Sequence, residues 1–570
     1  MRSIFHKITT GKFGIPVLII VLAGINWLAS LYHTRVDFTN EKRFTLSQPT
    51  KKLLKQLDKD IEVDIFLKGE FPSAFKQLAN SADETLQEFT EIAGSRLRYK
   101  FIAPDEQVDD GSPETYADTL AALGLNAINL KSQLKEGEQQ QLVYPAAIVR
   151  CDDKMIPVDL YSGDKTVISP AELNSAEALM EYKFADAIEK SVVTTRPMVG
   201  YSIGNGEPMG ANVEDLAQNV LLKNYDLQTI KINEQPFIPD TFKLLIVVKP
   251  TIPFTDEETQ KIDQYVMRGG KVLWFIDALN AEVDSLQIKN EVIAYDRGLG
   301  LNDLFFKYGV RINPSLIMDL QCDFLPMVVN GNNQMDYLHW NYFPLFESKS
   351  DNLIDKNIGL VAGQFVNSID TVEADGIKKT VLLSSSDNSR VIATPALISG
   401  RENSVAPEDD KFKQSGIPAA VLLEGKFESM YKYRASQAMK DSLAKYGEPL
   451  LDQCAEDNKM IIVADGDIPL NSMSTDKQLL PMGMNRYTYG TQYQYQFANK
   501  EFVQNCLDYL INPYGLTEAK GKDYVLRLLD PKKVDDQRLL WQVTDIAGPI
   551  FLVLLFAFIY QWWRKKKYVA

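Results

Sequence analysis

The chain has 570 residues, of which 76 are acidic and 61 are basic, so its formal net charge is −15 at pH 7. A protein this acidic is not expected to bind nucleic acid, whose phosphates attract basic surfaces. The length exceeds what one hydrophobic core normally organises, and we expect about two to four domains.

A basic tail, residues 1–12, precedes an uncharged apolar run, residues 13–32. The tail contains Arg2, Lys7 and Lys12 and no acidic residue. A helix over this run would be about 30 Å long, the thickness of the hydrocarbon core of a bilayer. We therefore predict a transmembrane helix whose basic end lies in the cytoplasm.

A cleaved signal peptide would have the same basic start and apolar centre. Its cleavage site needs small residues, but Trp27, Leu28 and Leu31 occupy the region where they would stand. A lipoprotein signal would place a cysteine where the chain has Ile25. We interpret the segment as an uncleaved anchor.

Residues 33–192 are expected to form an N-terminal α+β domain. Ser47 is typical of a helix N-cap, and Pro49 suits the first turn of the helix that follows. Residues 61–67 alternate apolar and polar side chains, which predicts a strand. The remaining expected elements are a helix over 73–93, a strand over 97–103, a hairpin over 142–160 and a helix over 174–192.

Residues 193–520 show the alternation of strands and helices that is typical of a parallel, doubly wound sheet. The run 243–250 is almost wholly apolar, as in a strand buried on both faces. Residues 278–458 are expected to supply insertions or an extra domain. The other expected elements are strands over 197–203, 226–232, 271–277 and 459–468 and helices over 213–224 and 255–270.

Several glycines and acids follow the expected strands, at the edge where open α/β sheets bind ligands. We group them as a candidate crevice. Its members are Gly204, Gly206, Glu207, Asp277, Asp465 and Asp467. The acids among them could hold a metal ion, but short acidic residues are also common in turns and caps. We favour turn and cap roles and predict neither a metal nor a cofactor.

Motifs of catalysis are missing from the sequence. No lysine that follows a glycine is followed by Ser or Thr, so there is no G-K-[ST] phosphate loop. The turn at 204–207 has Met209 where a dinucleotide fingerprint needs its third glycine. His339 is the one histidine between residues 34 and 570, and no serine lies in a G-x-S-x-G elbow. We therefore predict that the protein is not an enzyme.

Two aromatic stretches could anchor a partner. The first, residues 336–346, contains Trp340 and Tyr342, which we take as candidate partner contacts. The second, residues 486–497, would place five rings on one face of an extended strand. The alternative for both stretches is ordinary packing between domains.

Four widely spaced cysteines form no C-x-x-C motif, which argues against a zinc or thioredoxin-like site. Spacing leaves open whether any of them pair in disulfides. They are Cys151, Cys322, Cys454 and Cys506.

A connector, residues 521–545, leads to a second uncharged run, residues 546–563. That run ends in Trp562 and Trp563, whose rings suit the membrane interface. A basic tail, residues 564–570, follows directly and marks a cytoplasmic end. The candidate membrane contacts of this tail are Arg564, Lys565, Lys566 and Lys567.

The two basic flanks predict that both termini are cytoplasmic and that residues 33–545 are periplasmic, at an inner membrane. Asn26 lies within the first apolar run, where an amide can hydrogen-bond to a neighbouring helix. We therefore expect Asn26 to face a protein partner rather than lipid.

Blocks spread over residues 37–534 resemble, in order, the gliding-motility-associated ABC transporter auxiliary proteins (GldG type) of Bacteroidota. They include the stretch 37–78, "EYKFADAIEK", "GYSIGNGE", "YGVRINPSLIMDLQC", "IKKTVLLSSS" and "IIVADGDI". The resemblance implies an amidotransferase-like α/β domain without a supported nucleophile. It also implies a substrate-binding-type subunit beside a separate ABC permease subunit and a cytoplasmic ATPase subunit.

The sequence thus predicts a non-catalytic, membrane-anchored auxiliary subunit of an ABC transporter complex. Two other classes of protein stay open. One is a periplasmic enzyme, and the other a solute-binding protein, each using the candidate crevice.

Overall fold

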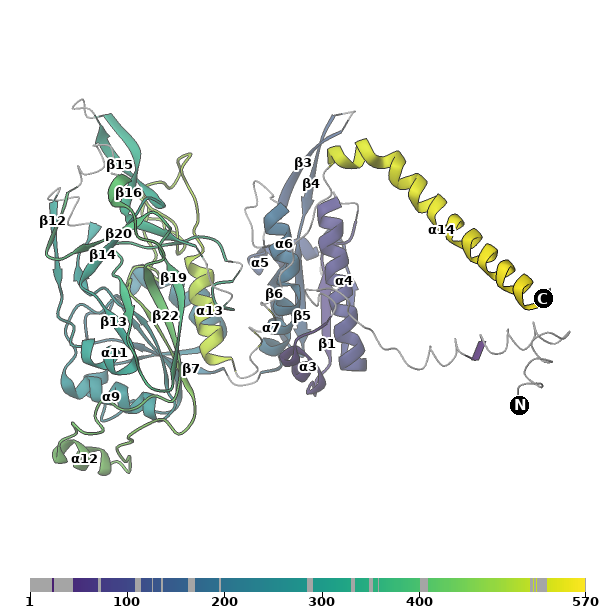
Figure 1. Ribbon diagram of the computed structural model, residues 1–570. Helices are drawn as coiled ribbons and strands as arrows, with labels where there is room; N and C mark the ends of the chain where they lie inside the picture. The colour runs from purple at the N-terminus through teal and green to yellow at the C-terminus, as the bar shows by residue number, and fades with distance from the viewer. Residues whose placement is uncertain are drawn as a thin grey trace. The chain divides into compact units, whose positions relative to one another are not determined.

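The chain forms two compact units, Met1–Lys522 and Asp523–Ala570, in the computed structural model (Figure 1). The residues that the structure describes are 23–24, 45–69, 73–107, 114–125, 127–134, 137–161, 170–193, 196–283, 291–329, 334–347, 352–356, 358–399, 409–512, 516, 519 and 531–568. The predicted first membrane run, with Asn26, lies outside them except for Ala23 and Gly24.

The N-terminal part of the first unit is built on a four-stranded mixed sheet with the strand order β2-β1-β5-β6. Strand β1 pairs in parallel with β2 and antiparallel with β5, and β5 and β6 form the predicted hairpin. Its strands and helices are α3 (Gln48–Lys55), β1 (Ile61–Ile65), α4 (Ser73–Ala93), β2 (Leu97–Phe101), α5 (Tyr116–Ala122), β3 (Ile128–Leu134), β4 (Gly137–Val143), β5 (Ala146–Cys151), β6 (Lys154–Asp159), α6 (Pro170–Ala178) and α7 (Met180–Val192).

Local chemistry explains these elements. The Ser47 hydroxyl accepts a hydrogen bond from the Thr50 N–H at the start of α3, as predicted for an N-cap. The alternating side chains of β1 place Val63 and Ile65 in one hydrophobic core with the apolar faces of α3, α4 and α7. Leu516 and Ala519, far along the chain, also pack in this core.

The second part of the unit contains a seven-stranded sheet with the order β19-β22-β23-β10-β9-β7-β8. Its five strands from β23 to β8 run parallel, and β22 is antiparallel to both of its neighbours, β23 and β19. The strands are β7 (Met198–Ser202), β8 (Asp226–Ile230), β9 (Phe242–Val248), β10 (Lys271–Phe275), β19 (Ile377–Ser384), β22 (Pro418–Gly425) and β23 (Asn458–Val463).

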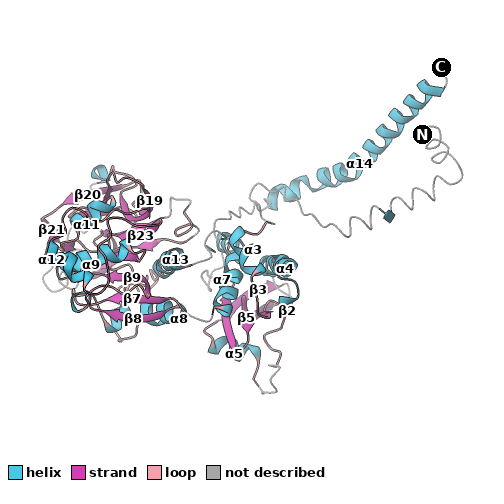
Figure 2. Cartoon of the chain, turned by 90° about the horizontal axis from the view of Figure 1, so that it is seen from below, coloured by secondary structure: helices cyan, strands magenta, loops and turns pink. Residues whose placement is uncertain are grey.

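Helices cover both faces of this sheet, as predicted (Figure 2). Along β9, Leu244 and Ile246 enter the core beneath α13, whereas Leu245 and Val247 enter the core beneath α9 and α11. The apolar run of β9 is therefore explained by burial on both sides. The covering helices are η3 (Asp215–Leu221, a π-helix), α8 (Leu222–Asn224), α9 (Asp256–Met267), α11 (Asn302–Tyr308) and α13 (Asn499–Ile511).

Short sheets and one further helix fill most of the segment between β10 and β23. They include β11 (Leu279–Asn280), β12 (Glu291–Asp296), β13 (Val310–Ile312), β14 (Ser315–Asp319), β15 (Cys322–Val329), β16 (Gln334–Phe346), β17 (Val361–Ala362), β18 (Ile369–Thr371), β20 (Ser389–Ala393), β21 (Ala396–Ser399) and α12 (Gln437–Ala444). Part of this segment builds a separate hydrophobic core around Trp340 and Phe343.

Both expectations for the aromatic stretches are corrected. Trp340 and Tyr342 are 0% and 1% exposed, so their rings pack inside the protein and offer no surface to a partner. Residues 486–497 form turns rather than an extended strand. Gly490 adopts a φ of 75°, which reverses the chain within the stretch.

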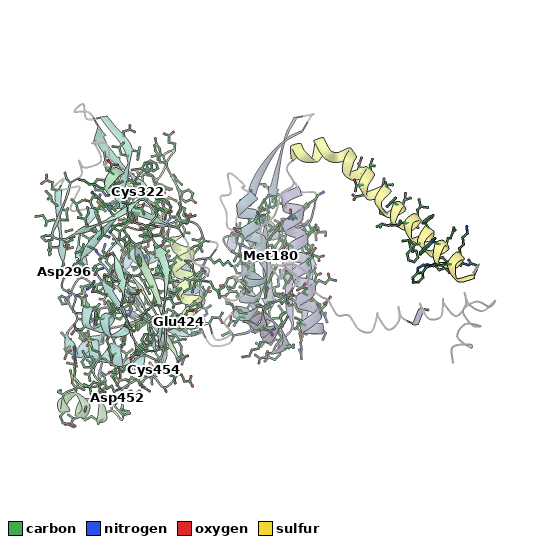
Figure 3. All side chains as sticks on the ribbon, viewed as in Figure 1. Met180, Asp296, Cys322, Glu424, Asp452 and Cys454 are labelled. Atoms are coloured by element: carbon green, nitrogen blue, oxygen red, sulfur yellow. The ribbon has the colours of Figure 1, made fainter. Side chains whose placement is uncertain are left out.

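All four cysteines are free and buried, and Cys322 and Cys454 are labelled in Figure 3. Burial raises the pKa of the Cys454 thiol to about 11, so it remains protonated. The cysteines are therefore packing residues in this structure.

The second unit contains helix α14, Pro531–Tyr568. Its stretch Gln542–Lys566 is long and apolar enough to cross a membrane and is not buried within the protein. Trp562 and Trp563 are exposed near its end, ahead of the basic residues. This stretch contains the predicted second membrane run.

A buried carboxylate ties α9 to the loop after β22. Asp263 accepts hydrogen bonds from the Ser429 hydroxyl (2.6 Å), the Tyr308 hydroxyl (2.8 Å) and the Met430 N–H (2.9 Å). We predict that Asp263→Ala lowers the stability of the full chain by about 3 kcal/mol or more, because buried donors lose their acceptor.

Thermal unfolding of the full chain in detergent, followed by circular dichroism, measures this loss. Asp303→Ala is the control, because the Asp303–Arg434 ion pair is exposed and is worth at most about 1 kcal/mol. Equal shifts for both variants would contradict the assigned role of Asp263.

Candidate functional site

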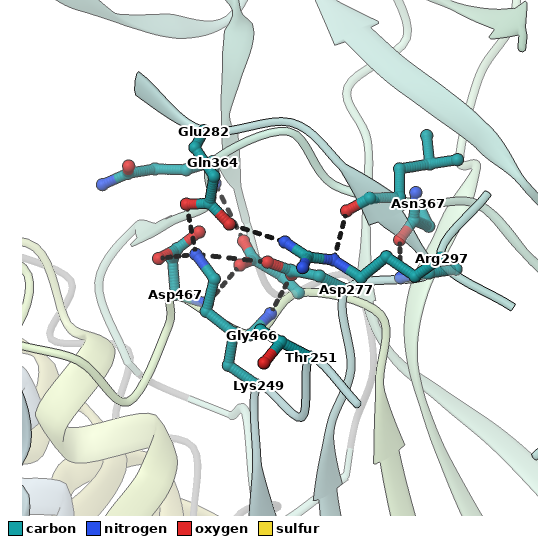
Figure 4. Close-up of polar contacts among 12 residues, drawn as sticks. Lys249, Thr251, Asp277, Glu282, Arg297, Gln364, Asn367, Gly466 and Asp467 are labelled. Carbon is teal, nitrogen blue, oxygen red and sulfur yellow. Dashed lines mark hydrogen bonds and ion pairs between the residues drawn. The ribbon is translucent and has the colours of Figure 1, made fainter. Parts of the chain in front are cut away.

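Three neighbouring parallel strands, β9, β10 and β23, end at the same edge of the seven-stranded sheet. Lys249 follows β9, Asp277 follows β10, and Asp465 and Asp467 follow β23. The side chains of Lys249, Asp277 and Asp467 meet beyond the strand ends (Figure 4), and a carboxylate oxygen of Asp465 lies close to those of the two other aspartates. We call this group, with Glu282, the edge cluster.

Backbone groups fix the acids of the edge cluster. The Asp465 side chain is fully buried; its Oδ1 accepts the N–H of Asp467 at 2.7 Å and its Oδ2 the N–H of Gln364 at 2.8 Å. Asp277 accepts a hydrogen bond from the N–H of Gly466. One carboxylate oxygen from each of the three aspartates lies within 4.8 Å of the others. This is close enough for strong mutual repulsion if all three are charged.

Lys249 supplies the opposing charge. Its Nζ lies 2.7 Å from Asp467 Oδ1, 3.0 Å from Glu282 Oε2 and 3.3 Å from Asp277 Oδ2. Arg297 adds a second cation, 2.6 Å from the other oxygen of Glu282. The edge cluster is therefore an ion-pair network built from four different segments of the chain.

The pKa values of the edge cluster follow from burial and crowding. Burial raises the pKa of Asp467 to about 7, against the lowering effect of Lys249. Burial, with the charges of Asp467 and Asp277, raises the pKa of Asp465 well above its usual range. Burial alone would lower the pKa of Lys249, but the surrounding carboxylates outweigh it and hold that pKa well above the usual value. Lys249 is therefore charged at neutral pH.

This arrangement bears on metal binding. Three carboxylates at this separation suit a divalent cation. The ammonium group of Lys249, however, already lies within ion-pair distance of two of them. A metal ion would have to displace it, so the donor set fits an internal lysine better than a resident metal.

The glycine turn after β7 is a separate feature. Glu207 Oε1 accepts from the Ser202 hydroxyl at 2.9 Å, and its Oε2 accepts from the Asn205 N–H at 2.7 Å. These contacts lie within its own turn, as a turn role requires. Gly204 and Gly206 have positive φ, and a Cβ on Gly206 would lie 2.0 Å from Thr251 Oγ1.

The structure thus brings together Asp277, Asp465 and Asp467 of the candidate crevice, and gives Glu207 other partners. Sequence reasoning missed Lys249, although a lysine directly after the apolar run 244–248 was a usable signal. It also missed Glu282 and Arg297, which come from the segment without a clear periodic pattern.

The fold and the edge cluster define an α/β protein that carries, among the described residues, one apolar helix of membrane-spanning length and a sheet edge whose acids pair with Lys249 and Arg297. Residues 196–506, more than half of the chain, match the model of a family described as an ABC-type uncharacterized transport system. The chain belongs to this family of ABC transporter auxiliary proteins, which gives it a transport-associated auxiliary role. Residues 40–150 match a domain of unknown function, DUF7088.

An uncharacterized protein of Borreliella burgdorferi is 23% identical over 463 residues, which cover 77% of this chain and 82% of that protein. Among solved structures, the mmIFT52 N-terminal domain is 12% identical, with a TM-score of 0.30, and covers 55% of this chain and 97% of its own. The exo-beta-1,4-mannosidase Op5Man5 from Opitutaceae bacterium strain TAV5 is 11% identical, with a TM-score of 0.18, and covers 68% and 46%. These scores are too low to support any argument from fold.

We predict that Lys249→Met destabilises the full chain by about 3–5 kcal/mol, because it leaves buried carboxylates without a counter-charge. Lys231→Met is the matched control. Lys231 pairs with Glu234 at the surface, where an ion pair is worth about 1 kcal/mol or less. Thermal or urea unfolding of the two variants in detergent measures the difference.

The defect of Lys249→Met should shrink as the pH falls from about 8 to about 5. The folded-state pKa of Asp467 is raised, so between its unfolded and folded pKa values the folded state binds more protons. Stability then falls as pH rises through that window, and loss of Lys249 steepens the fall. A defect of the same size at both pH values would contradict the ion-pair account.

Proposed function

We propose that the protein is a non-catalytic, membrane-anchored auxiliary subunit of an ABC transporter complex. The observation that carries the proposal is the edge cluster. In open α/β sheets, ligands usually bind at the carboxyl ends of the strands. In the α/β domain of this transport-family protein, the side chain of Lys249 occupies that position. The apolar stretch Gln542–Lys566 supports a membrane anchor. The missing phosphate loop supports a separate motor subunit.

The proposed topology has both termini in the cytoplasm and one membrane crossing near each end, in an inner membrane. The sequence support is the basic flank outside each apolar run. The proposed parts are a tail (1–12), a helix (13–32), an α+β domain (33–192), an α/β domain with insertions (193–520), a connector (521–545), a helix (546–563) and a basic tail (564–570). The large part between the helices would be periplasmic.

The proposed mechanism is mechanical. ATP hydrolysis by a cytoplasmic ATPase would move a permease, and helices packed against that permease would move the periplasmic body. The resemblance to GldG-type proteins supports a role in gliding motility or secretion, a substrate-binding-type assignment and an amidotransferase-like α/β domain. Trp562, Trp563 and the basic residues after them would hold the second helix at the cytoplasmic interface.

A second candidate is a periplasmic enzyme or solute-binding protein that uses the sheet edge. The raised pKa values of Asp465 and Asp467 favour it, because perturbed pKa values gather at functional sites. Loss of function in Asp465→Ala or Glu207→Ala, with folding and assembly intact, would support the enzyme. Thermal stabilisation by one compound from a metabolite or glycan library would support the solute-binding protein.

The topology gives the next prediction. A reporter fused after residue 570 should be active in the cytoplasm, and one inserted near residue 400 should be active only outside it, because the basic flanks retain both ends. Paired alkaline phosphatase and fluorescent-protein fusions measure this. A cytoplasmic signal near residue 400 would contradict the whole arrangement.

The complex gives another prediction. Affinity purification from native membranes should recover a permease and an ATPase with this chain, identified by mass spectrometry. Replacing residues 13–32 by poly-leucine with the same basic flanks should keep the topology but reduce recovery of the permease, because Asn26 and the small residues of that run are lost.

The matched control is the single substitution Asn26→Leu in the otherwise native run. It separates the effect of losing the amide from the effect of changing the shape of the helix. Native recovery of the permease with the poly-leucine chain would show that the first helix is only an anchor. Purification without any ABC subunit would contradict the proposed function.

A further inference from the structure

A cavity lies at the edge of the seven-stranded sheet opposite to the edge cluster, where β7, β9 and β10 begin. Its volume is about 540 Å³, within the range of pockets that hold small ligands. Residues at the strand starts and in the turn after α9 line it. We call it the amino-edge pocket.

The amino-edge pocket is basic, although the chain as a whole is acidic. Arg196, Lys243, Arg268 and Lys271 line it, with Asp240 as the one lining acid. The lining therefore carries three more positive than negative formal charges. Lys243 is exposed and forms no ion pair among the described residues.

Arg268 is the most constrained of these bases. Its side chain is 8% exposed; Nε lies 2.8 Å from Asp240 Oδ1 and 3.8 Å from Glu448 Oε2, and Nη2 donates to the carbonyl oxygen of Ile238 at 2.9 Å. Its Nη1 has no acceptor among the described residues. A buried guanidinium nitrogen without an acceptor is costly, and an anion in the pocket would supply one.

Lys271 lies near other positive charges and donates to a neutral acceptor in the amino-edge pocket. Burial lowers the pKa of Lys271, and the nearby charges of Lys459 and Lys243 lower it further. Its Nζ donates to the carbonyl oxygen of Leu510 at 2.6 Å, a neutral acceptor. A bound anion would offset the repulsion among these lysines and raise the pKa of Lys271 again.

Much of the remaining wall is apolar. Pro197, Met198, Phe242 and Ile511 line the pocket beside the bases. A ligand that fills the cavity therefore has an anionic group and a less polar portion. A phosphate monoester matches this description, because its charge of about −1.5 to −2 at pH 7 offsets much of the positive surplus of the lining.

We propose that the amino-edge pocket binds a phosphate monoester through Arg268, Lys243 and Lys271. This inference is independent of the proposed ABC complex. A soluble phosphate ester and the headgroup of phosphatidic acid share the required chemistry.

Isothermal titration of the full chain in a neutral detergent tests the proposal, with inorganic phosphate and sn-glycerol 3-phosphate as probes. We expect saturable binding of both probes at one site, with glycerol 3-phosphate the tighter because its carbon chain contacts the apolar wall. Lys243→Glu should weaken binding at least about tenfold, and added sodium chloride should weaken it in the native chain.

Lys413→Glu is the matched control, because Lys413 is exposed and does not line the pocket. It should leave the affinity unchanged. Lys243 is a surface residue, so its variant should fold, and circular dichroism verifies this. No saturable binding of either probe, or equal weakening by both variants, would overturn the proposal.

Nanodiscs distinguish the two sources of the ligand. In phosphatidylcholine nanodiscs that also contain phosphatidic acid, a lipid headgroup in the pocket would compete with glycerol 3-phosphate and lower its apparent affinity. The same affinity with and without phosphatidic acid would assign the pocket to a soluble ester. Both results require the saturable binding that Lys243→Glu weakens.

Discussion

The ammonium group of Lys249 is the interaction on which the carboxyl edge of the sheet depends. Parallel strands bring Asp277, Asp465 and Asp467 together at that edge, and the lysine offsets their repulsion. The backbone accommodates it: Lys249 has a φ of 44°, and a Cβ on Gly466 would lie 2.7 Å from the Lys249 Cβ. The close approach of the two loops explains both the positive φ of Lys249 and the need for glycine at position 466.

Much of the fold follows from hydrophobic periodicity. The apolar runs of β9, β10 and β23 predicted a parallel sheet, and with it the convergence of the acids at its edge. The lysine was harder to predict, because a sequence does not say which side chain crosses between loops. Glu282 and Arg297 were beyond prediction, since they come from irregular segments whose position depends on tertiary packing.

The aromatic stretches show where local patterns mislead. Alternate tyrosines in residues 486–497 imitate the period of a strand, but local hydrogen bonds favour turns: Asn485 Oδ1 accepts the N–H of Tyr487, and the Thr491 hydroxyl donates to the carbonyl oxygen of Thr488. Trp340 lies in a run rich enough in rings for a binding surface, yet the same rings are what a small separate core requires. Composition alone does not distinguish a buried aromatic cluster from an exposed one.

The two edges of the sheet differ in charge. At the carboxyl edge, Lys249 and Arg297 form ion pairs with the acids, whereas the amino edge retains a surplus of positive charge. At the carboxyl edge, ion pairs join side chains from separate segments of the chain. At the amino edge, the basic lining is the basis of the anion site that we propose.

The central claim is that the edge cluster is structural, and a double variant tests it most directly. Lys249→Met combined with Asp467→Asn removes both charges of the shortest ion pair that Lys249 forms but keeps approximate shape, and neutral replacements of buried pairs are often tolerated. The account predicts that the double variant, unlike Lys249→Met alone, complements a deletion strain at normal protein levels. A double variant that is folded and abundant yet inactive would contradict the account and point to chemistry at Asp467.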